Sequence, residues 1–580
     1  MTNTRPYVDL LLRYTWPLRR RVALLGLCVF TGLGLQLVRP QILRAVIDAA
    51  QTAGAQQLGG LTLLFLGAAL VTQVVAVLSS YMTADVALRS TNALRADLAE
   101  HCLNLDIGFH NTHTPGEMIE RIDSDVSELS SFLAQMIVVI VANGLLLLGI
   151  LVLLFQTHWL IGLALTLFVA LTIMLLERVR TIAVPAWIAS QQAQAELYGY
   201  LEERLVGAQD LRALGAGPYV LRRFYTVMRS AYQRSLRAGL MSGLTANSTL
   251  LLFAIGGAVA LFVSAYVYRQ GGMTIGTAFM VFYYAEMLTA PITVITANIN
   301  HMQQATAAIT RIRQLMETRS AIQDGPGLSL PGGAVAVELD RVTFGYDPAH
   351  PVLHDLSLRV APGRTLGLVG RTGHGKTTIA RLLLGLYAPQ HGVIRLDGQD
   401  IRLARRADLA RAVGLVTQNV QLFAATVRDN ITLFNPAVPD GQILRVIEEL
   451  GLSAWYRRLP DGLDTRLAGD NSLSAGEAQL LALTRIFLRD PQVVVLDEAS
   501  SRLDPATEAL LEQALGRLTD GRTTIIIAHR LATVQRADDI AVIEQGRIVE
   551  YGSRAELTAN ADSHFASLLR RSVSLDEVVR

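Results

Sequence analysis

One octapeptide constrains the architecture of this chain more than any other stretch: Gly370-Arg371-Thr372-Gly373-His374-Gly375-Lys376-Thr377. It fits the pattern G-x-x-x-x-G-K-[ST], with a β-branched run at 365–369 before it and a helical run at 378–386 after it. Glycines let backbone N–H groups turn inward onto phosphate oxygens, and the N-terminus of the following helix favours negative charge. Lys376 would neutralise phosphate charge, and the Thr377 hydroxyl would bind Mg²⁺. A glycine turn without a ligand is the alternative, and the flanking strand and helix argue against it.

The sequence on both sides of this loop predicts an α/β domain with a largely parallel sheet. After a linker rich in Gly and Pro at 321–333, short β-branched runs alternate with helical runs through 334–580. The run at 493–496 delivers two adjacent carboxylates, Asp497 and Glu498, to the end of a strand. Asp497 suits the Mg²⁺ shell, and Glu498 could polarise an attacking water. An apolar run followed by Asp-Glu is weak evidence alone, but together with the phosphate loop it is strong.

The first 320 residues predict a helical membrane domain. The chain has 580 residues, of which 51% are hydrophobic and 17% are charged, and its net charge of +2 gives no argument for nucleic acid. A span needs about 20 apolar residues, and arginines mark the cytoplasmic side. The first apolar run is longer than the apolar region of a signal peptide and ends at Arg39-Pro40 rather than at a small-residue cleavage site, so we expect it to stay uncleaved. The arginines before it indicate a cytoplasmic N-terminus. The predicted spans are about 22–42, 59–84, 131–156, 159–178, 239–268 and 273–300.

Two polar stretches between the spans are too long to be simple loops. Residues 89–128 and 177–237 are rich in Arg, Glu and Gln and keep a helical period. We therefore expect spans two to five to continue as helices well into the cytoplasm, with turns near Pro115 and near 215–218. The predicted fold is multidomain, with an all-α polytopic membrane domain followed by an α/β P-loop NTPase domain.

Further motifs resemble those of the ATP-binding cassette family, in the order that the family has. Leu473-Ser474-Ala475-Gly476-Glu477 resembles the family signature, and Tyr346 resembles the aromatic residue that stacks on adenine. The resemblance implies a helical subdomain inserted in the ATPase domain. It also implies that Glu498, His529 and Gln418 are catalytic, and that ATP is bound by Tyr346, the phosphate loop and Thr378. Mg²⁺ would be bound by Thr377, Gln418 and Asp497. Asp504 would belong to the D-loop, and the ATP of a partner would be contacted by Ser474, Ala475, Gly476 and Glu477.

The membrane half resembles the exporter type of this family, in which six spans precede the ATPase on one chain. The segments 109–125 and 207–223 resemble the two coupling segments. The resemblance implies a half transporter that pairs with a second one and couples hydrolysis of ATP, with Mg²⁺, to alternating access. It further implies a multi-pass protein of the bacterial inner membrane with a cytoplasmic ATPase domain.

Four residues depart from the family pattern. Ala475 stands where Gly is usual, Glu477 where Gln is usual and Ala478 where a basic residue is usual, and His374 is unusual in a phosphate loop. Ser474 and Glu477 also form the pattern of a capping box, which needs no ligand, and we expect both roles to hold. An altered signature beside intact Glu498 and His529 fits a heterodimer with one weakened ATP site, and it equally fits a tolerated variant in a homodimer. For His374, we expect the ring to point to solvent.

The substrate and the direction of transport stay open in the sequence. Glu286 lies near the middle of the sixth span, where it fits either a contact for a cationic substrate or a protonated carboxyl group between helices. The spans fit a lipid, a drug or a small metabolite equally. Export is the expected direction; an importer on the same architecture and a membrane ATPase that regulates a partner are the alternatives. A soluble cassette protein is excluded by the predicted spans.

Overall fold

The computed structural model describes residues 5–52, 55–135, 140–417, 420–469, 473–497, 505–528 and 531–570. Two compact units make up the chain: residues 1–103 with 115–318, and residues 104–114 with 319–580. The short segment 104–114 therefore belongs to the second unit, although helices of the first unit flank it in sequence. The predicted boundaries of the membrane domain, linker and ATPase domain stay predictions.

The first unit is built from long helices, and helix-forming sequence continues far beyond the length of an apolar span. Its α-helices, together with the short α4 that belongs to the second unit, are α1 (Arg5–Thr15), α2 (Arg19–Thr52), α3 (Ala55–Asn104), α4 (Ile107–Thr112), α5 (Pro115–Ile119), α6 (Asp125–Gln135), α7 (Val141–Thr157), α8 (Trp159–Val206), α9 (Ala208–Ala213), α10 (Gly217–Arg269), α11 (Ile275–Met287) and α12 (Thr289–Glu317). At 53 residues, α10 is about 80 Å long, well over the roughly 30 Å of a hydrocarbon core. Helices of this length must extend beyond the bilayer, as the polar stretches of the sequence predict.

Five helices in the described part of the chain are long and apolar enough to cross a membrane. They correspond to five of the predicted spans, and the remaining one, 131–156, contains the shorter apolar helix α7. The predicted break between the third and fourth spans is confirmed, since α7 ends at Thr157 and α8 begins at Trp159. Between them His158 is extended, and its ring nitrogen accepts the N–H of Leu160, which caps α8.

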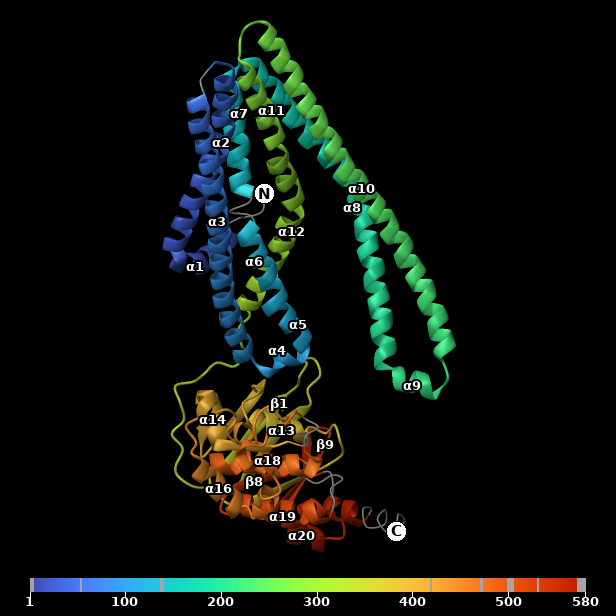
Figure 1. The fold of residues 1–580 in the computed structure, drawn as a ribbon. Helices are drawn as coiled ribbons and strands as arrows, with labels where there is room; N and C mark the ends of the chain where they lie inside the picture. Colours follow the sequence, from blue (N-terminus) through green and yellow to red (C-terminus); the bar gives the residue numbers. More distant parts are fainter. Residues whose placement is uncertain are drawn as a thin grey trace. The chain divides into compact units, whose positions relative to one another are not determined.

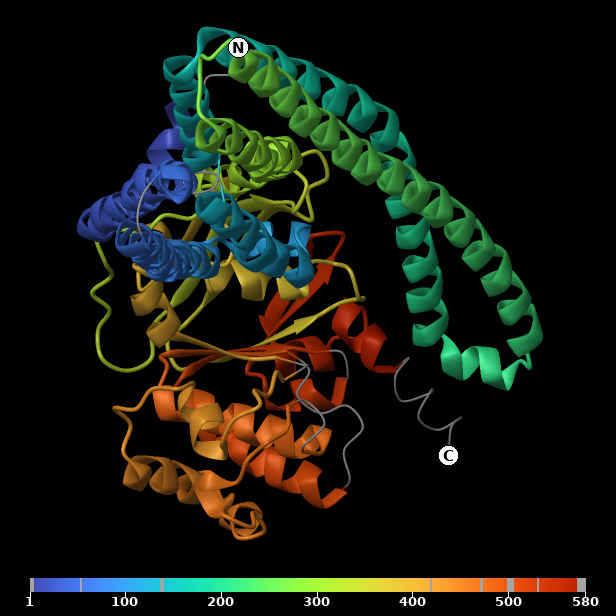
Figure 2. The ribbon, with the colours of Figure 1, turned by 45° about the horizontal axis from the view of Figure 1, so that its top comes forward.

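The core of this unit lies where α7, α8, α10 and α11 meet. Helices α8 and α10 run side by side over most of their length (Figures 1 and 2). Glycines permit close approach in this core: a Cβ at Gly256 of α10 would come within 2.5 Å of the Phe168 ring on α8. The largest fully buried side chains here are Ile150, Leu154, Ile161, Leu165, Met280, Tyr284, Leu288 and Ile292.

The predicted sixth span is not one continuous helix, because it breaks at Leu288 between α11 and α12. Pro291 has no N–H to donate to the carbonyl of Met287, four residues earlier, and this explains the break. Near the other end of α12, Arg311 binds the carboxylate of Asp125 on α6 through Nε, at 2.9 Å, and Nη2. Asp125 is buried, so this ion pair fixes α6 against α12.

The second unit combines two sheets with surrounding helices. Its strands are β1 (Val337–Phe344), β2 (Leu353–Val360), β3 (Thr365–Val369), β4 (His391–Leu396), β5 (Gln399–Asp400), β6 (Val413–Val416), β7 (Val493–Asp497), β8 (Thr523–Ile527), β9 (Asp539–Glu544) and β10 (Arg547–Ser553). Its helices beside α4 are α13 (Lys376–Leu383), α14 (Arg406–Ala412), α15 (Val427–Thr432), α16 (Asp440–Glu449), α17 (Ser453–Tyr456), α18 (Ala475–Arg489), α19 (Pro505–Thr519) and α20 (Arg554–Ala559).

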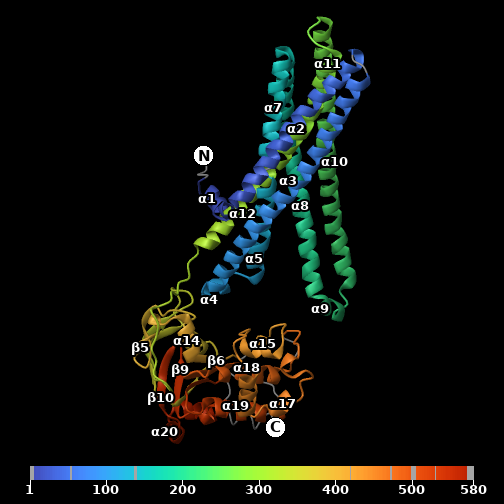
Figure 3. The same ribbon diagram turned by 60° about the vertical axis from the view of Figure 1, so that its left-hand side comes forward.

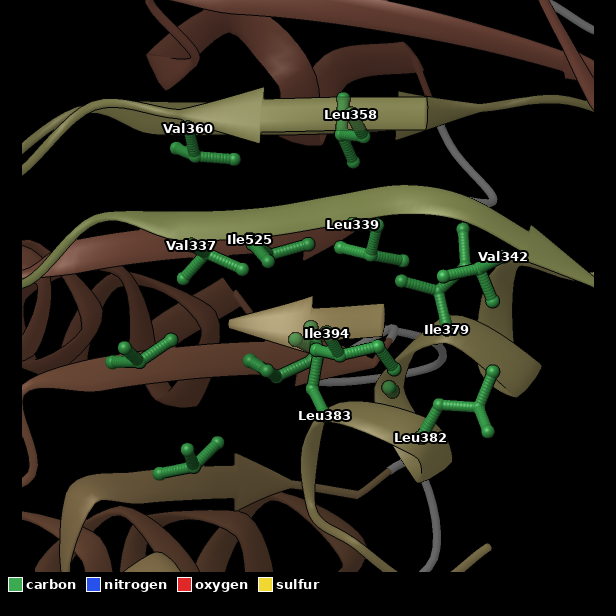
Figure 4. Packing of buried hydrophobic residues seen from close by; sticks show 14 of the residues in the cluster. Val337, Leu339, Val342, Leu358, Val360, Ile379, Leu382, Leu383, Ile394 and Ile525 are labelled. Carbon is green, nitrogen blue, oxygen red and sulfur yellow. The ribbon is translucent and has the colours of Figure 1, made fainter. Parts of the chain in front are cut away.

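The larger sheet has the order β10-β9-β3-β8-β7-β6, and the strands from β9 to β6 are parallel. This confirms the parallel sheet that the alternating pattern predicts. The smaller sheet, β2-β1-β4-β5, is antiparallel. Helix α13 lies between the two sheets, and Figure 4 shows its Ile379, Leu382 and Leu383 among Val337 of β1, Ile394 of β4 and Ile525 of β8. Burying each such side chain contributes about 1.5–3 kcal/mol.

A second apolar cluster belongs to a helical subdomain inserted between β6 and β7. Helices α15, α16, α17 and α18 surround the fully buried Trp455, and α18 also packs on α19. In Figure 3, α15 and α17 lie at the opposite end of this unit from β5. The insertion that the family resemblance implies is therefore present, and α18 carries the predicted signature at its first turn.

Candidate active site

The phosphate loop follows β3 as predicted, and its glycines adopt backbone conformations that other residues rarely reach. Gly370 has φ +155°, Gly373 +87° and Gly375 +97°. A Cβ at Gly370 would lie 2.3 Å from the carbonyl oxygen of Ile543 on β9, so no side chain fits there. Helix α13 begins directly afterwards at Lys376. The loop is therefore a backbone cradle that ends at a helix N-terminus, as a phosphate site requires.

Lys376 is buried, and its ammonium group folds back across the loop. The Nζ atom donates to the carbonyl oxygens of Gly370, at 2.6 Å, and Arg371, at 3.0 Å. These two carbonyl oxygens accept the hydrogen bonds of a buried ammonium group, and phosphate oxygens could replace them as acceptors. The polar residues Arg371 and Thr372 are exposed, whereas Thr377 is half-buried. A cationic donor thus lies inside the cradle, which fits a polyphosphate.

His374 corrects the expectation of a solvent-facing ring. Its Nδ1 lies 3.2 Å from the carbonyl oxygen of Ile543, and the residue is half-buried. The same carbonyl blocks a side chain at Gly370, so one peptide of β9 supports the loop at two points. The sequence could not reveal this contact, because Ile543 lies 169 positions further along the chain.

Asp497 lies at the same edge of the sheet as the phosphate loop. It is the last residue of β7 and pairs with Ile527 of β8, which in turn pairs with Leu368 of β3. Because parallel strands end at one edge, the Asp497 carboxylate and the loop are separated by one strand, or about 10 Å between the axes of β3 and β7. This placement agrees with a shared site for nucleotide and Mg²⁺, with Thr377 and Asp497 as the described donors.

Four predicted residues lie outside the described residues: Gln418, Glu498, Asp504 and His529. In sequence, Gln418 follows β6, Glu498 follows β7, and His529 follows β8. The strands that precede them, β8, β7 and β6, follow β3 in that order across the sheet, run parallel to it and end at the edge that carries the phosphate loop. Their roles stay predictions.

Tyr346 lies beside the helix that follows the phosphate loop. The residue is 47% exposed, and the guanidinium of Arg381 lies over its ring, 5.7 Å from the centroid. The hydroxyl group lies 3.2 Å from the hydroxyl of the buried Thr378 and accepts a hydrogen bond of 2.9 Å from Arg381. The ring of Tyr387 meets it edge-on, with 5.2 Å between centroids. Arg381 and Tyr387 were missed by sequence reasoning, because neither belongs to a motif.

Tyr387 also contacts the segment 104–114, which contains α4. The side-chain amide of Asn111 donates to the Tyr387 hydroxyl at 2.6 Å. Asp106 caps α4 by accepting the N–H of Phe109 at 2.9 Å, and its other oxygen accepts the N–H of Ala321 at 2.7 Å. Burial raises the pKa of the Asp106 carboxyl, but these N–H donors lower it more, so the net pKa lies below the ordinary value. Within this unit, the start of the predicted first coupling segment thus contacts Tyr387, whose ring meets that of Tyr346.

The signature has the predicted capping box at the N-terminus of α18. Ser474 accepts the N–H of Glu477 at 3.3 Å, and the Glu477 carboxylate accepts the Ser474 N–H at 3.1 Å. The same carboxylate also accepts the Ser474 hydroxyl at 3.0 Å, and Arg458 lies 4.0 Å from its other oxygen. Ala475 is exposed and Gly476 buried. The one proton of the Ser474 hydroxyl is therefore engaged by a carboxylate rather than free for phosphate.

In the first unit, Glu286 lies on α11 opposite a glycine of α10. A Cβ at Gly257 would be 3.3 Å from Oε1 of Glu286. The residue is exposed in the single chain, and within the described residues it forms no ion pair. The structure therefore does not place it buried between helices, and its role stays a prediction.

The comparisons with known proteins agree with both units. Residues 22–292 match the family described as the ABC transporter transmembrane region, and residues 353–501 match the family described as ABC transporter. A fatty acid ABC transporter ATP-binding/permease protein of Mycobacterium bovis is 30% identical over 473 residues, which cover 81% of this chain and 75% of the relative. An ATP-dependent lipid A-core flippase of Chromohalobacter salexigens is 30% identical, with 94% of each chain covered.

An importer and a solved exporter are also similar. The mycobactin import ATP-binding/permease protein IrtA of Mycobacterium tuberculosis is 34% identical over 81% of this chain, although only 55% of that relative is covered. The solved structure of a bacterial Atm1-family ABC exporter with ATP bound has a TM-score of 0.82 at 26% identity, covering 96% of this chain and 99% of the other. With its helical membrane region fused to an α/β ATPase domain, this chain belongs to the ABC transporter family and is an ATP-driven transport ATPase of the exporter architecture.

Proposed function

We propose that this chain is one half of an exporter that moves an amphipathic or apolar substrate from the cytoplasmic side of a bacterial inner membrane. The observation that carries the proposal is the phosphate cradle at 370–377, on the same chain as helices of membrane-spanning length. Similarity to proteins named for fatty acid and lipid A-core supports a lipid-like substrate. Similarity to IrtA keeps import as the second candidate.

In the proposed cycle, ATP binds in the cradle, where Lys376 exchanges its two carbonyl partners for phosphate oxygens. The adenine stacks on the ring of Tyr346. Thr377 and Asp497, with Gln418, would hold Mg²⁺, which supplies positive charge that screens the phosphates. Glu498 orients and deprotonates the attacking water, and His529 stabilises the γ-phosphate.

The signature of one half transporter closes over the ATP of the other. Ser474 and the free N–H groups at the start of α18 would receive the γ-phosphate, because a helix N-terminus attracts anions. Glu477 weakens this attraction because its carboxylate accepts the hydrogen bond of the Ser474 hydroxyl and adds negative charge. A second copy and a distinct chain with an unaltered signature both fit as the partner. Expressing this chain alone distinguishes them, because a homodimer predicts a stable, hydrolysing dimer.

The test of the proposed chemistry is Glu498→Gln in the full chain, reconstituted in lipid nanodiscs. We expect ATP binding to be kept and turnover to fall by at least about 10²-fold, since a general base typically contributes 10²–10⁴-fold. Glu448→Gln, an exposed glutamate on α16, is the matched control. Hydrolysis at the wild-type rate in the Glu498 variant would remove the proposed role. Uptake into inverted vesicles distinguishes export from import.

A further inference from the structure

Arg39 is a cation inside the apolar part of α2. The carboxylate of Asp48 accepts the N–H of Gly276 at 3.0 Å and so fixes one end of α2 against the start of α11. Arg39 precedes Asp48 by nine residues, which places it about 13 Å from Asp48 along the helix axis, toward the N-terminus of α2. A charged side chain at such a depth is costly unless it faces a partner or a cavity, and it usually serves function.

Within the described residues, Arg39 has no ion-pair partner. Its Nε atom is buried and makes no hydrogen bond. The guanidinium lies over the ring of Phe65 on α3, 5.6 Å from the centroid, so one face is covered by an aromatic ring. By contrast Arg44, on the same helix, pairs with Asp48 at 3.7 Å. The Nε donor of Arg39 therefore still requires an acceptor.

Glu286 lies at a similar depth but on the wrong side to supply that acceptor. It follows Gly276 by ten residues, or about 15 Å. The Tyr284 hydroxyl donates to the carbonyl of Leu37 at 2.6 Å and accepts from Gln41 at 3.2 Å, so this face of α2 meets α11. Arg39 is midway between Leu37 and Gln41 and, at about 100° per residue, lies on the opposite face.

The same rotation of about 100° per residue turns the Glu286 side chain away from α2. It is two residues after Tyr284, so it points away from α2, and its carboxylate lies against Gly257 of α10. The two charges are therefore on different sides of the α2–α11 pair. Arg39 faces α3 instead, where the residues around Phe65 are apolar and exposed, among them Leu63, Leu64 and Leu66.

We propose that Arg39 binds the anionic headgroup, a carboxylate or a phosphate, of a transported amphiphile whose hydrocarbon chain lies along the apolar surface of α2 and α3. This inference rests on the proposed function and names its substrate class. Guanidinium binds carboxylate and phosphate through two parallel hydrogen bonds, and the Phe65 ring lies beneath this group without supplying an acceptor to it. Exposed Val38 and Leu66 offer apolar contact to the chain of the ligand.

The test is equilibrium binding of radiolabelled oleate to the full chain in phosphatidylcholine nanodiscs, with monooleyl phosphate and oleyl alcohol as competitors. Oleyl alcohol has the same chain without the charge. For the wild type we expect both anionic compounds to compete at least tenfold better than the alcohol. Arg39→Gln should weaken oleate binding at least tenfold, Arg39→Lys should restore part of it, and Arg44→Gln is the matched control that keeps it.

The outcomes separate this inference from the proposed function. Unchanged oleate binding in Arg39→Gln, or an equal loss of oleate and alcohol binding, overturns the anionic site. Displacement of oleate by phosphatidylglycerol in the bilayer, with no oleate stimulation of hydrolysis, assigns Arg39 to a resident lipid and overturns its role in substrate binding. Failure of the wild type to hydrolyse ATP at all, with oleate binding intact, contradicts the proposed function instead.

Discussion

Replacing Glu477 by Gln should tighten productive binding of ATP. In the proposed dimer, Ser474 faces the γ-phosphate of the partner's ATP, and the Glu477 carboxylate lies 3.0 Å from the Ser474 hydroxyl. A phosphate oxygen hydrogen-bonded to that hydroxyl would be about 5 Å from the carboxylate. The repulsion per unit charge is then about 3 kcal/mol at an effective dielectric constant of 20 and about 0.8 kcal/mol in water.

The structure favours the lower half of that range. The Glu477 side chain is 28% exposed, and Arg458 lies 4.0 Å from it, so solvent and a cation both reduce the repulsion. We take about 1–1.4 kcal/mol, which is a 5- to 10-fold change in affinity. Gln keeps the ability to accept the Ser474 N–H in a capping box, so the stability of α18 should change little.

The assay is the KM for ATP of the full chain in nanodiscs, measured at low and high salt. We expect Glu477→Gln to lower KM 5- to 10-fold, with the gap to the wild type shrinking at high salt because the repulsion is screened. Glu448→Gln controls for the loss of one negative charge in the helical subdomain. A KM within twofold of the wild type at low salt, or a gap that grows with salt, would refute the electrostatic reasoning.

Three further predictions concern contacts that hold each unit together. Tyr387→Phe keeps the ring but removes the acceptor of the Asn111 amide at 2.6 Å, a loss of about 1 kcal/mol; substrate-stimulated hydrolysis should fall more than basal hydrolysis, and equal effects would argue against signalling through this contact. Because the folded-state pKa of Asp106 is depressed, its stabilising effect is full above the ordinary carboxyl pKa and is lost as pH falls through the lower folded value. The thermal midpoint of Asp106→Asn should therefore lie below that of the wild type at pH 7 and converge with it in acid, and a constant difference would contradict this linkage. Arg311→Met leaves the buried Asp125 carboxylate unpaired and should destabilise the protein by about 2–4 kcal/mol in denaturant titration, while the double change with Asp125→Leu should recover much of it.

Features with local causes could be read from the sequence. The glycine pattern at 370–377 requires positive φ at defined places, and the structure has it. The capping box at Ser474 and the hairpin at His158 likewise depend only on neighbouring residues. The parallel sheet followed from β-branched runs separated by helices, since parallel strands need long crossovers.

Features with distant causes could not be read from the sequence. Asn111 and Tyr387 are 276 positions apart, and neither has a composition or spacing that predicts their contact. Assignment of 104–114 to the second unit depends on the same long-range packing. The break at Leu288 could have been predicted from Pro291, but the apolar composition of 273–300 concealed it, because hydropathy does not register a missing N–H donor.

The depth of a charged residue in a membrane span can be predicted from the sequence, but the helix that its side chain faces cannot. Composition alone singled out Glu286, whereas Arg39 entered only as the residue that, with Pro40, ends the first apolar run. Contacts reverse that emphasis. The hydrogen bonds of Tyr284 fix which face of α2 meets α11 and thereby turn Arg39 and Glu286 to opposite sides. No described residue pairs with Arg39, and in an ATP-driven transporter the substrate is a component able to arrive and leave with each cycle.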